Sequence, residues 1–252
     1  MTRNPIEAAS ARATPYAFRY TVPDEFVRLP DPAAVDGWWE TLARLNPDAD
    51  ETHLAATTEQ LRAALPGLSR GGEETVDLTA LCLGTEDVGG EERLSMGLLA
   101  VTVKPSGHRD RLLTAEGVYR AKEQKFYAGE RELRELDFPL GKGVQGRQDM
   151  LLAVKLPCGP GVMSTSLRMV TVPARLAAEA GLADGGAGER IRPALPMATL
   201  QLVVPAPRDY CVYVTISTPS VFLLDSYSGR LARIGRTLSF DVPREERERA
   251  ED

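Results

Sequence analysis

The chain has 252 residues, of which 43% are hydrophobic and 6% aromatic, so it can bury the core of one large domain or two small ones. Its 36 acidic and 30 basic side chains give a net charge of -6, which excludes a global attraction to nucleic acid or anionic membranes. No stretch resembles a secretory signal or reaches the length of a membrane span. These features predict a cytoplasmic protein that neither binds nucleic acid nor inserts into a membrane.

Cysteine and histidine are scarce, and their spacing argues against a metal site. Cys82, Cys158 and Cys211 are widely separated, and His53 and His108 are the only histidines. No C-x-x-C or H-x-x-x-H pair is present, so a zinc site and a disulfide framework are both disfavoured. We therefore expect free, mostly buried thiols in a reducing compartment, with no metal and no cofactor.

Composition divides the chain into three regions. Residues 1–15 are small, polar and uneven in character, and residues 242–252 are charged without an apolar stripe. The first region is predicted to be disordered, and the second to be a solvated helix or a disordered tail. Residues 16–241 are predicted to form a single domain.

Two strands and two helices are predicted at the start of this domain. The strands cover residues 16–22 and 25–29, and the helices cover residues 31–45 and 51–65. Trp38 and Trp39 fall in the first helix among apolar residues at helical spacing. This spacing favours burial of at least one of these tryptophans, but an exposed aromatic surface is the alternative.

Further along the chain, strand-like runs arrive in pairs joined by turns. The turn-rich stretch Gly84–Gly90 separates one pair, and Pro157–Gly161 separates another. The predicted strands cover residues 77–83, 94–103, 150–156, 162–172, 197–204 and 211–217. Consecutive paired strands indicate hairpins, so the predicted fold class is α+β with a central antiparallel sheet flanked by helices. A doubly wound parallel sheet is the alternative.

Two longer helices complete the prediction. Residues 110–136 are strongly charged but carry an apolar residue at every seventh position, at Leu112, Tyr119, Phe126 and Leu133. A second helix is predicted to begin at Pro219 and to lie back across the last hairpin. Its apolar positions are Val221, Leu224, Leu231, Ile234 and Leu238.

Motifs that would indicate catalysis are weak. Gly141–Gly146 matches G-x-G-x-x-G, but it lacks the preceding strand and following helix of a dinucleotide site. Leu224–Gly229 only faintly resembles a nucleophile elbow and falls inside a predicted amphipathic helix. Cys158, in a turn and with His53 or His108 as its base, is the candidate nucleophile that we retain.

Several segments carry a resemblance to a known group of proteins. They are Phe26–Pro30, Val154–Gly161, and Leu202–Pro205 followed by Thr215–Pro219 and a terminal helix. Over residues 16–240 in outline, the chain resembles a class of uncharacterised actinomycete proteins that are similar in layout to the PsbP/Mog fold. That fold is an antiparallel sheet flanked by helices, and its members are mostly non-enzymatic assembly or binding proteins. The resemblance therefore implies no catalytic residues.

These patterns favour a non-catalytic adaptor or chaperone-like accessory protein that acts by protein contact, for example in a secretion or envelope-assembly system. The candidate contact residues are Trp38, Trp39, Tyr119, Phe126 and Tyr127, because aromatic side chains often carry the binding energy of interfaces. Two alternatives stay open. One is a small hydrolase or transferase with a Cys or carboxylate site, and the other is a module that binds a small apolar ligand between sheet and helix. The sequence indicates no oligomeric state.

Overall fold

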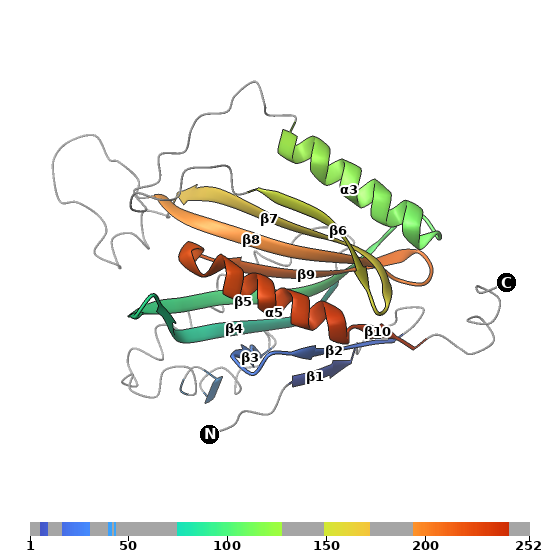
Figure 1. The fold of residues 1–252 in the computed structure, drawn as a ribbon. Coiled ribbons are helices and arrows are strands. Elements are labelled where there is room, and N and C mark those ends of the chain that lie inside the picture. Colours follow the sequence, from blue (N-terminus) through green and yellow to red (C-terminus); the bar gives the residue numbers. More distant parts are fainter. Residues whose placement is uncertain are drawn as a thin grey trace.

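The computed structural model describes residues 6–9, 17–30, 40–41, 43, 75–127, 149–171 and 194–241. In this part of the chain, strands form two antiparallel sheets, and two long helices accompany them (Figure 1). The strands are β1 (Ile6–Ala9), β2 (Phe18–Val22), β3 (Phe26–Arg28), β4 (Thr75–Val88), β5 (Glu91–Pro105), β6 (Met150–Leu156), β7 (Gly159–Thr171), β8 (Ala194–Pro205), β9 (Tyr210–Thr218) and β10 (Ser239–Phe240). The helices are α3 (Arg111–Tyr127) and α5 (Leu224–Thr237), and the short 3-10 helix η2 (Val221–Leu223) precedes α5.

The large sheet has seven strands in the order β3-β4-β5-β9-β8-β7-β6, and each neighbouring pair is antiparallel. The predicted hairpins β4–β5, β6–β7 and β8–β9 are all formed. The α+β class with a central antiparallel sheet is thereby confirmed, and the parallel alternative is wrong for the described residues. Neither helix described here has both the length and the apolar character needed to cross a membrane.

The β4–β5 hairpin is longer than the sequence pattern predicts. The stretch Gly84–Gly90 is expected to be a turn-rich break, but β4 continues to Val88, and Gly89 and Gly90 alone make the turn. Their φ angles of 66° and 89° lie in the left-handed region, which glycine adopts without strain. The turn therefore needs no more than these two residues, and the strands on either side stay paired up to it.

Helix α5 covers one face of the large sheet and contacts β8, β9 and β2 (Figure 1). Tyr227, Leu231 and Ile234 recur at intervals of four and three residues, so they share one helical face, and all three are fully buried. They join a core with strand residues that include Leu200 and Ile216. The predicted helix across the last hairpin is confirmed, although its α-helical part begins at Leu224 rather than at Pro219.

Helix α3 lies on the opposite face of the sheet, over β6, β7 and β8. Lys122 on this helix donates hydrogen bonds to Ser164 and to Gln201, at 3.0 and 2.7 Å. The Gln201 side chain must point away from α5, because its neighbours along the strand, Leu200 and Leu202, are buried in the α5 core. Burial, and secondarily the charge of nearby Lys125, lowers the pKa of the Lys122 ammonium.

The apolar stripe predicted for α3 is only partly correct. The helix is confirmed over Arg111–Tyr127, and residues 128–136 lie outside the described part of the chain. Tyr119 and Phe126 of the seven-residue repeat lie on the packed side, but Leu112 is 69% exposed. The buried or half-buried positions are Arg111, Thr114, Ala115, Val118, Tyr119, Lys122 and Phe126. Two of these are cationic, and this explains why an apolar pattern located only part of the packed face.

A small second sheet has the order β1-β2-β10 and joins the two ends of the domain. Residues Ile6–Ala9 pair with β2, which corrects the expectation of disorder at these four positions; the rest of residues 1–15 lies outside the described part. On the other side of β2, Phe18 pairs with Phe240, and the N–H of Asp241 donates to the carbonyl of Ala17 at 2.8 Å. Strand order therefore brings together segments that are distant in sequence.

Candidate functional site

The aromatic residues predicted as contact residues are only partly placed by the structure. Trp38 and Trp39 lie outside the described residues, and of Tyr127 only the backbone is described. Tyr119 is half-buried, and Phe126 is 8% exposed, so its ring is enclosed rather than available on the helix surface. The described residues therefore do not bring these aromatic side chains together into one open patch.

Cys158, the candidate nucleophile, occupies the β6–β7 turn and is half-buried. Its carbonyl accepts a hydrogen bond from the guanidinium of Arg111, whose Nε also donates to the carbonyl of Pro205 at 2.9 Å. Burial raises the pKa of the Cys158 thiol above its ordinary value, although the Arg111 charge and a backbone hydrogen bond act in the opposite direction. His53 lies outside the described residues, and His108 is exposed in the loop before α3.

This environment predicts slow chemistry at the Cys158 thiol. In the folded protein, Cys158 should react with iodoacetamide more slowly than free cysteine at pH 7.5, and the rate should rise as the pH passes 9, because the thiolate is the reactive form. Mass spectrometry of quenched samples measures the rate for each cysteine. The control is the urea-unfolded chain, in which buried Cys82 and Cys211 should react as fast as Cys158. Reaction of folded Cys158 faster than free cysteine would instead indicate an activated nucleophile.

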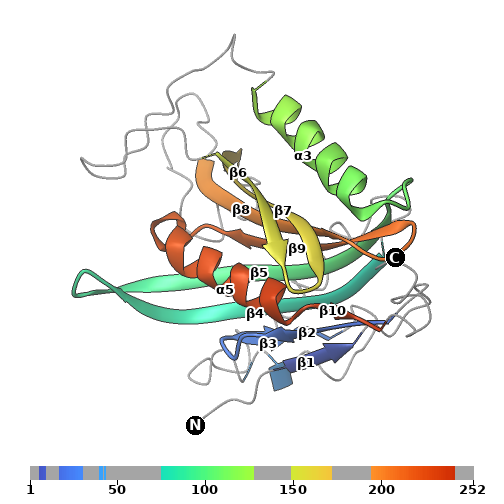
Figure 2. The ribbon, with the colours of Figure 1, turned by 45° about the vertical axis from the view of Figure 1, so that its right-hand side comes forward.

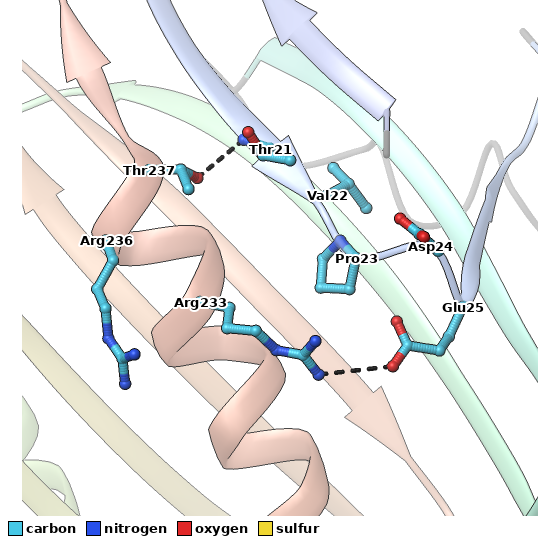
Figure 3. A pocket seen from close by; sticks show the side chains of 8 residues that line it. All are labelled: Thr21, Val22, Pro23, Asp24, Glu25, Arg233, Arg236 and Thr237. Atoms are coloured by element: carbon cyan, nitrogen blue, oxygen red, sulfur yellow. Dashed lines mark hydrogen bonds and ion pairs between the residues drawn. The ribbon is translucent and has the colours of Figure 1, made fainter. Parts of the chain in front are cut away.

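A charged cleft of about 450 Å³ lies between the last turns of α5 and the segment that joins β2 to β3 (Figure 3). Arg233 extends across the cleft toward Glu25, with 3.5 Å between the nitrogen and oxygen atoms, whereas Arg236 points along the helix. The backbone N–H of Thr21 donates to Thr237 Oγ1 at 2.9 Å and ties the two walls together. The cleft is open, and its Arg233 and Glu25 side chains already face one another. Among the described residues, no three Asp, Glu, His or Cys side chains gather as a possible metal site.

The end of the β4–β5 hairpin has a different character, because it extends past the neighbouring strands (Figure 2). The last residue of β5 that pairs with β9 is Leu98, and the last residue of β4 that pairs with β3 is Cys82. Beyond them the hairpin is two strands wide within the described residues. One of its faces is turned toward α5, and the other is turned away from it.

Four side chains on the face turned away from α5 form what we call the hairpin surface: Asp87, Glu92, Leu94 and Met96. Leu94 and Met96 are 57% and 36% exposed, and they follow Glu92 at every second residue of β5. Asp87 on β4 stands directly opposite Glu92, and both are exposed. Two like charges directly opposite one another destabilise a strand pair. The surface therefore combines exposed apolar side chains with a repulsive pair of carboxylates.

The opposite face of the same hairpin is fastened to α5 by a polar network. Glu86 accepts hydrogen bonds from Ser95 Oγ at 2.5 Å, Ser226 Oγ at 2.7 Å and Arg230 Nη2 at 2.7 Å. The hydroxyl of Tyr227 lies 2.9 Å from Ser95 Oγ. Burial raises the pKa of Tyr227 to about 12, so its phenol stays neutral. The network links β4, β5 and α5 and holds the hairpin in a fixed position relative to the domain.

Opposing effects act on the pKa of Glu86. Burial by itself raises this pKa, but the hydrogen bonds from Ser95, Ser226 and Arg230 and the charge of Arg230 lower it below the ordinary value of 4.5. Arg230 is only 4% exposed, and its guanidinium also lies 3.6 Å from Glu25. Its Nε and Nη1 atoms have no hydrogen-bond partner among the described residues. The carboxylate of Glu86 is thus the main partner of a buried cation.

Two side chains cover the part of β5 that extends beyond β9. Ser220 Oγ accepts from the backbone N–H of Met96 at 3.1 Å and donates to the carbonyl of Leu94 at 2.9 Å. Thr218 Oγ1 donates to the carbonyl of Met96 at 2.6 Å. Buried backbone groups need such partners, so these contacts support the strand where its neighbour ends. They leave the side chains of Leu94 and Met96 uncovered.

Sequence reasoning missed the hairpin surface because large and small residues alternate along β5 in a way that suggests the wrong buried face. Leu94 and Met96 alternate with Ser95 and Gly97, and the usual reading of such alternation buries the larger residues. In the structure Ser95 and Gly97 face α5, since the ring of Tyr227 fills the space above Gly97. A signal was nevertheless present. If the predicted strand at residues 94–103 is extended back to the turn at Gly90, charged Glu92 falls on the same face as Leu94, which indicates that this face is exposed.

No family model, no curated protein and no solved structure matches this chain.

Proposed function

We propose that this protein is a non-catalytic accessory protein that acts by protein contact, and that the hairpin surface is its contact site. The observation that carries this proposal is the coincidence, on one face of a projecting hairpin, of exposed Leu94 and Met96 with the carboxylates of Asp87 and Glu92. Exposed apolar side chains rimmed by charge are typical of interaction sites. The matching partner has an apolar patch bordered by lysine or arginine side chains.

The energetics of the carboxylate pair support this choice of partner. In the free protein, Asp87 and Glu92 repel one another across the strand pair, and water screens the repulsion only in part. A basic partner that approaches this face would relieve the repulsion while it covers Leu94 and Met96. Because Glu86 and its hydrogen-bond partners hold the hairpin against α5, little conformational entropy has to be lost on binding. Charge complementarity of this kind also raises the association rate.

A matched pair of variants tests the proposal. Leu94→Gln with Met96→Gln removes the apolar part of the hairpin surface, and Leu112→Gln with Leu113→Gln makes the same chemical change on exposed positions of α3. Each tagged protein is expressed in its native cells, crosslinked and purified, and co-purifying proteins are quantified by isotope-labelled mass spectrometry. We expect a stoichiometric partner with the wild type and the α3 variant, and about a 30-fold weaker association with the hairpin variant.

Salt supplies a second readout for this proposal. Asp87→Asn with Glu92→Gln should weaken partner binding at 50 mM salt and have a smaller effect at 500 mM salt, because salt screens exposed charges. Circular dichroism of each variant checks that the fold is retained. Equal recovery of the partner with all variants, or equal loss with the α3 variant, contradicts the assignment of the hairpin surface. Recovery of the wild type without any partner contradicts the proposed function itself.

The proposed layout and cellular setting rest on the resemblance described above. A PsbP/Mog-like arrangement would place the protein among assembly and binding proteins, and a cytoplasmic accessory role in secretion or envelope assembly fits that group. The alternative of an apolar-ligand module finds less support, because Tyr227, Leu231 and Ile234 fill the space between α5 and the sheet. The alternative of a Cys enzyme finds less support from the raised pKa of Cys158.

A further inference from the structure

The β6 edge of the large sheet offers a second interaction surface, independent of the hairpin. β6 is the last strand in the sheet order of the described residues, and its sequence Met-Leu-Leu-Ala-Val-Lys-Leu contains one charge and no proline. Leu152 is 44% exposed, and Ala153 and Lys155 are exposed as well. An edge strand with unpaired backbone groups and apolar side chains is a template for another strand.

The register of the β6–β7 hairpin shows which backbone groups of β6 face outward. Lys155 stands opposite Pro160, which has no N–H, so this pair cannot be one that exchanges two hydrogen bonds. Antiparallel pairs alternate, and the doubly bonded pairs of β6 with β7 are therefore those at Met150, Leu152, Val154 and Leu156. The N–H and C=O groups of Leu151, Ala153 and Lys155 consequently point away from β7, toward the edge on which no described strand pairs with β6.

The opposite edge of the sheet is protected, which makes the β6 edge distinctive. β3 has only three residues and carries an exposed arginine, Arg28. Short length and charge are the usual devices that prevent edge-to-edge pairing. β6 has seven residues, compared with three in β3, and six of the seven are apolar. Its pairing with β7 has no register shift. An edge of this kind readily pairs with a further strand.

We propose that the occupant is a second copy of this chain, paired antiparallel through β6 about a two-fold axis at Ala153. In this register Ala153 stands opposite Ala153 of the second copy, and Leu151 stands opposite Lys155. These are the residues whose backbone groups face outward, and each of the three pairs exchanges two hydrogen bonds. The two seven-stranded sheets become one continuous sheet. A two-fold contact requires a self-complementary strand, and β6 satisfies this requirement.

The length of β6 selects this register, because only an axis at Ala153, its midpoint, pairs all seven residues of the strand with residues of β6 in the second copy. An axis at Lys155 would place two ammonium groups directly opposite one another, which destabilises a strand pair. An axis at Leu151, Leu152 or Val154 would pair only part of β6 with β6 of the second copy. With the axis at Ala153, each lysine stands opposite a leucine, and exposed Leu152 stands opposite Val154 on the face toward α5. The small side chain of Ala153 leaves room at the axis on the face toward α3.

A single proline substitution at the two-fold axis tests the dimer. Ala153→Pro removes the outward N–H but none of the hydrogen bonds between β6 and β7, so the fold should be retained. Ala153→Thr is the matched control, because it also changes the side chain but keeps the N–H. Sedimentation velocity over a concentration series should give a wild-type and Ala153→Thr dimer, with a dissociation constant that rises about tenfold or more in Ala153→Pro.

Hydrogen exchange of the wild type keeps the test decisive if Ala153→Pro does not fold. The amides of Leu151, Ala153 and Lys155 should gain protection as the protein concentration rises through the dissociation constant, while those of Leu152 and Val154 are protected at every concentration. A monomer at all concentrations overturns the proposal. A dimer with unprotected amides at these three residues overturns it as well, and so does protection that appears only when a different protein is added.

Discussion

Replacing Gly97 by alanine is expected to lower the free energy of unfolding by about 3 kcal/mol, since overpacking a closed core site costs this much. A Cβ atom at Gly97 would lie 2.5 Å from Cε1 of Tyr227, closer than van der Waals contact permits. The tyrosine ring cannot simply turn aside, because it is fully buried and its hydroxyl is hydrogen-bonded to Ser95. Urea denaturation monitored by fluorescence measures the change.

Gly84 provides the matched control for Gly97. It lies on β4 in the same hairpin, and an added Cβ would meet no atom within 4 Å, so Gly84→Ala should be neutral or slightly stabilising. Tyr227→Leu, which has no ring to clash, should be destabilising alone but should make Gly97→Ala less harmful in the double variant. Additive effects of Gly97→Ala and Tyr227→Leu, or equal effects of the two alanines, would contradict the close approach between Gly97 and the ring.

Replacing Glu86 by glutamine is expected to cost about 2 to 3 kcal/mol, somewhat less than the loss of an isolated buried ion-pair partner, because Glu25 still lies near Arg230. The variant keeps the size of the side chain and removes the charge that balances the guanidinium of Arg230, a residue that is only 4% exposed. Within the part of the chain that the structure describes, Arg230 Nε and Nη1 already have no hydrogen-bond partner, so little else can compensate. Thermal and urea unfolding at pH 7 measure the loss. Asp87→Asn, at the next residue but on the exposed face, should change stability by less than about 0.5 kcal/mol.

The same residue predicts a pH dependence. Because folding lowers the pKa of Glu86, its ionised form stabilises the folded state fully above the ordinary value of 4.5. That contribution is lost as the pH falls from this value through the lower pKa of the folded state. The stability difference between wild type and Glu86→Gln should therefore shrink below pH 4.5. A difference that stays constant down to pH 2 would show that the carboxylate charge does not carry the effect.

Local patterns predicted the fold class because its main contacts are hairpins between neighbours in sequence. Apolar alternation and turn residues mark both strands of each hairpin, and they needed no knowledge of the rest of the chain. The faces of β5 were harder to assign. Whether Leu94 or Ser95 faces α5 depends on Tyr227, which is more than a hundred residues away in sequence, and on the lack of a side chain at Gly97.

The candidate site was harder to predict from sequence patterns for a related reason. Asp87 and Glu92 become neighbours only when the turn is reduced to Gly89 and Gly90, and a turn-rich interpretation of Gly84–Gly90 keeps them apart. On α3, Lys122 packs toward the sheet because Ser164 and Gln201 accept its hydrogen bonds, and these partners come from two distant strands. Polar groups that are buried by long-range partners leave no periodic apolar signal.

The position of β2 between β1 and β10 sets a timing problem for synthesis on the ribosome. Arg19 of β2 forms an ion pair with Asp241, which follows β10, and the two residues are 222 apart in sequence. At about 5–20 residues per second, β2 is translated on the order of tens of seconds before β10, its second partner strand, exists. During this interval the side chains of Phe18, Tyr20 and Val22 lack the neighbours that bury them in the finished domain. The small sheet therefore cannot be completed until β10 has been synthesised, and a ribosome that stalls before Ser239 leaves β2 without β10 along one edge.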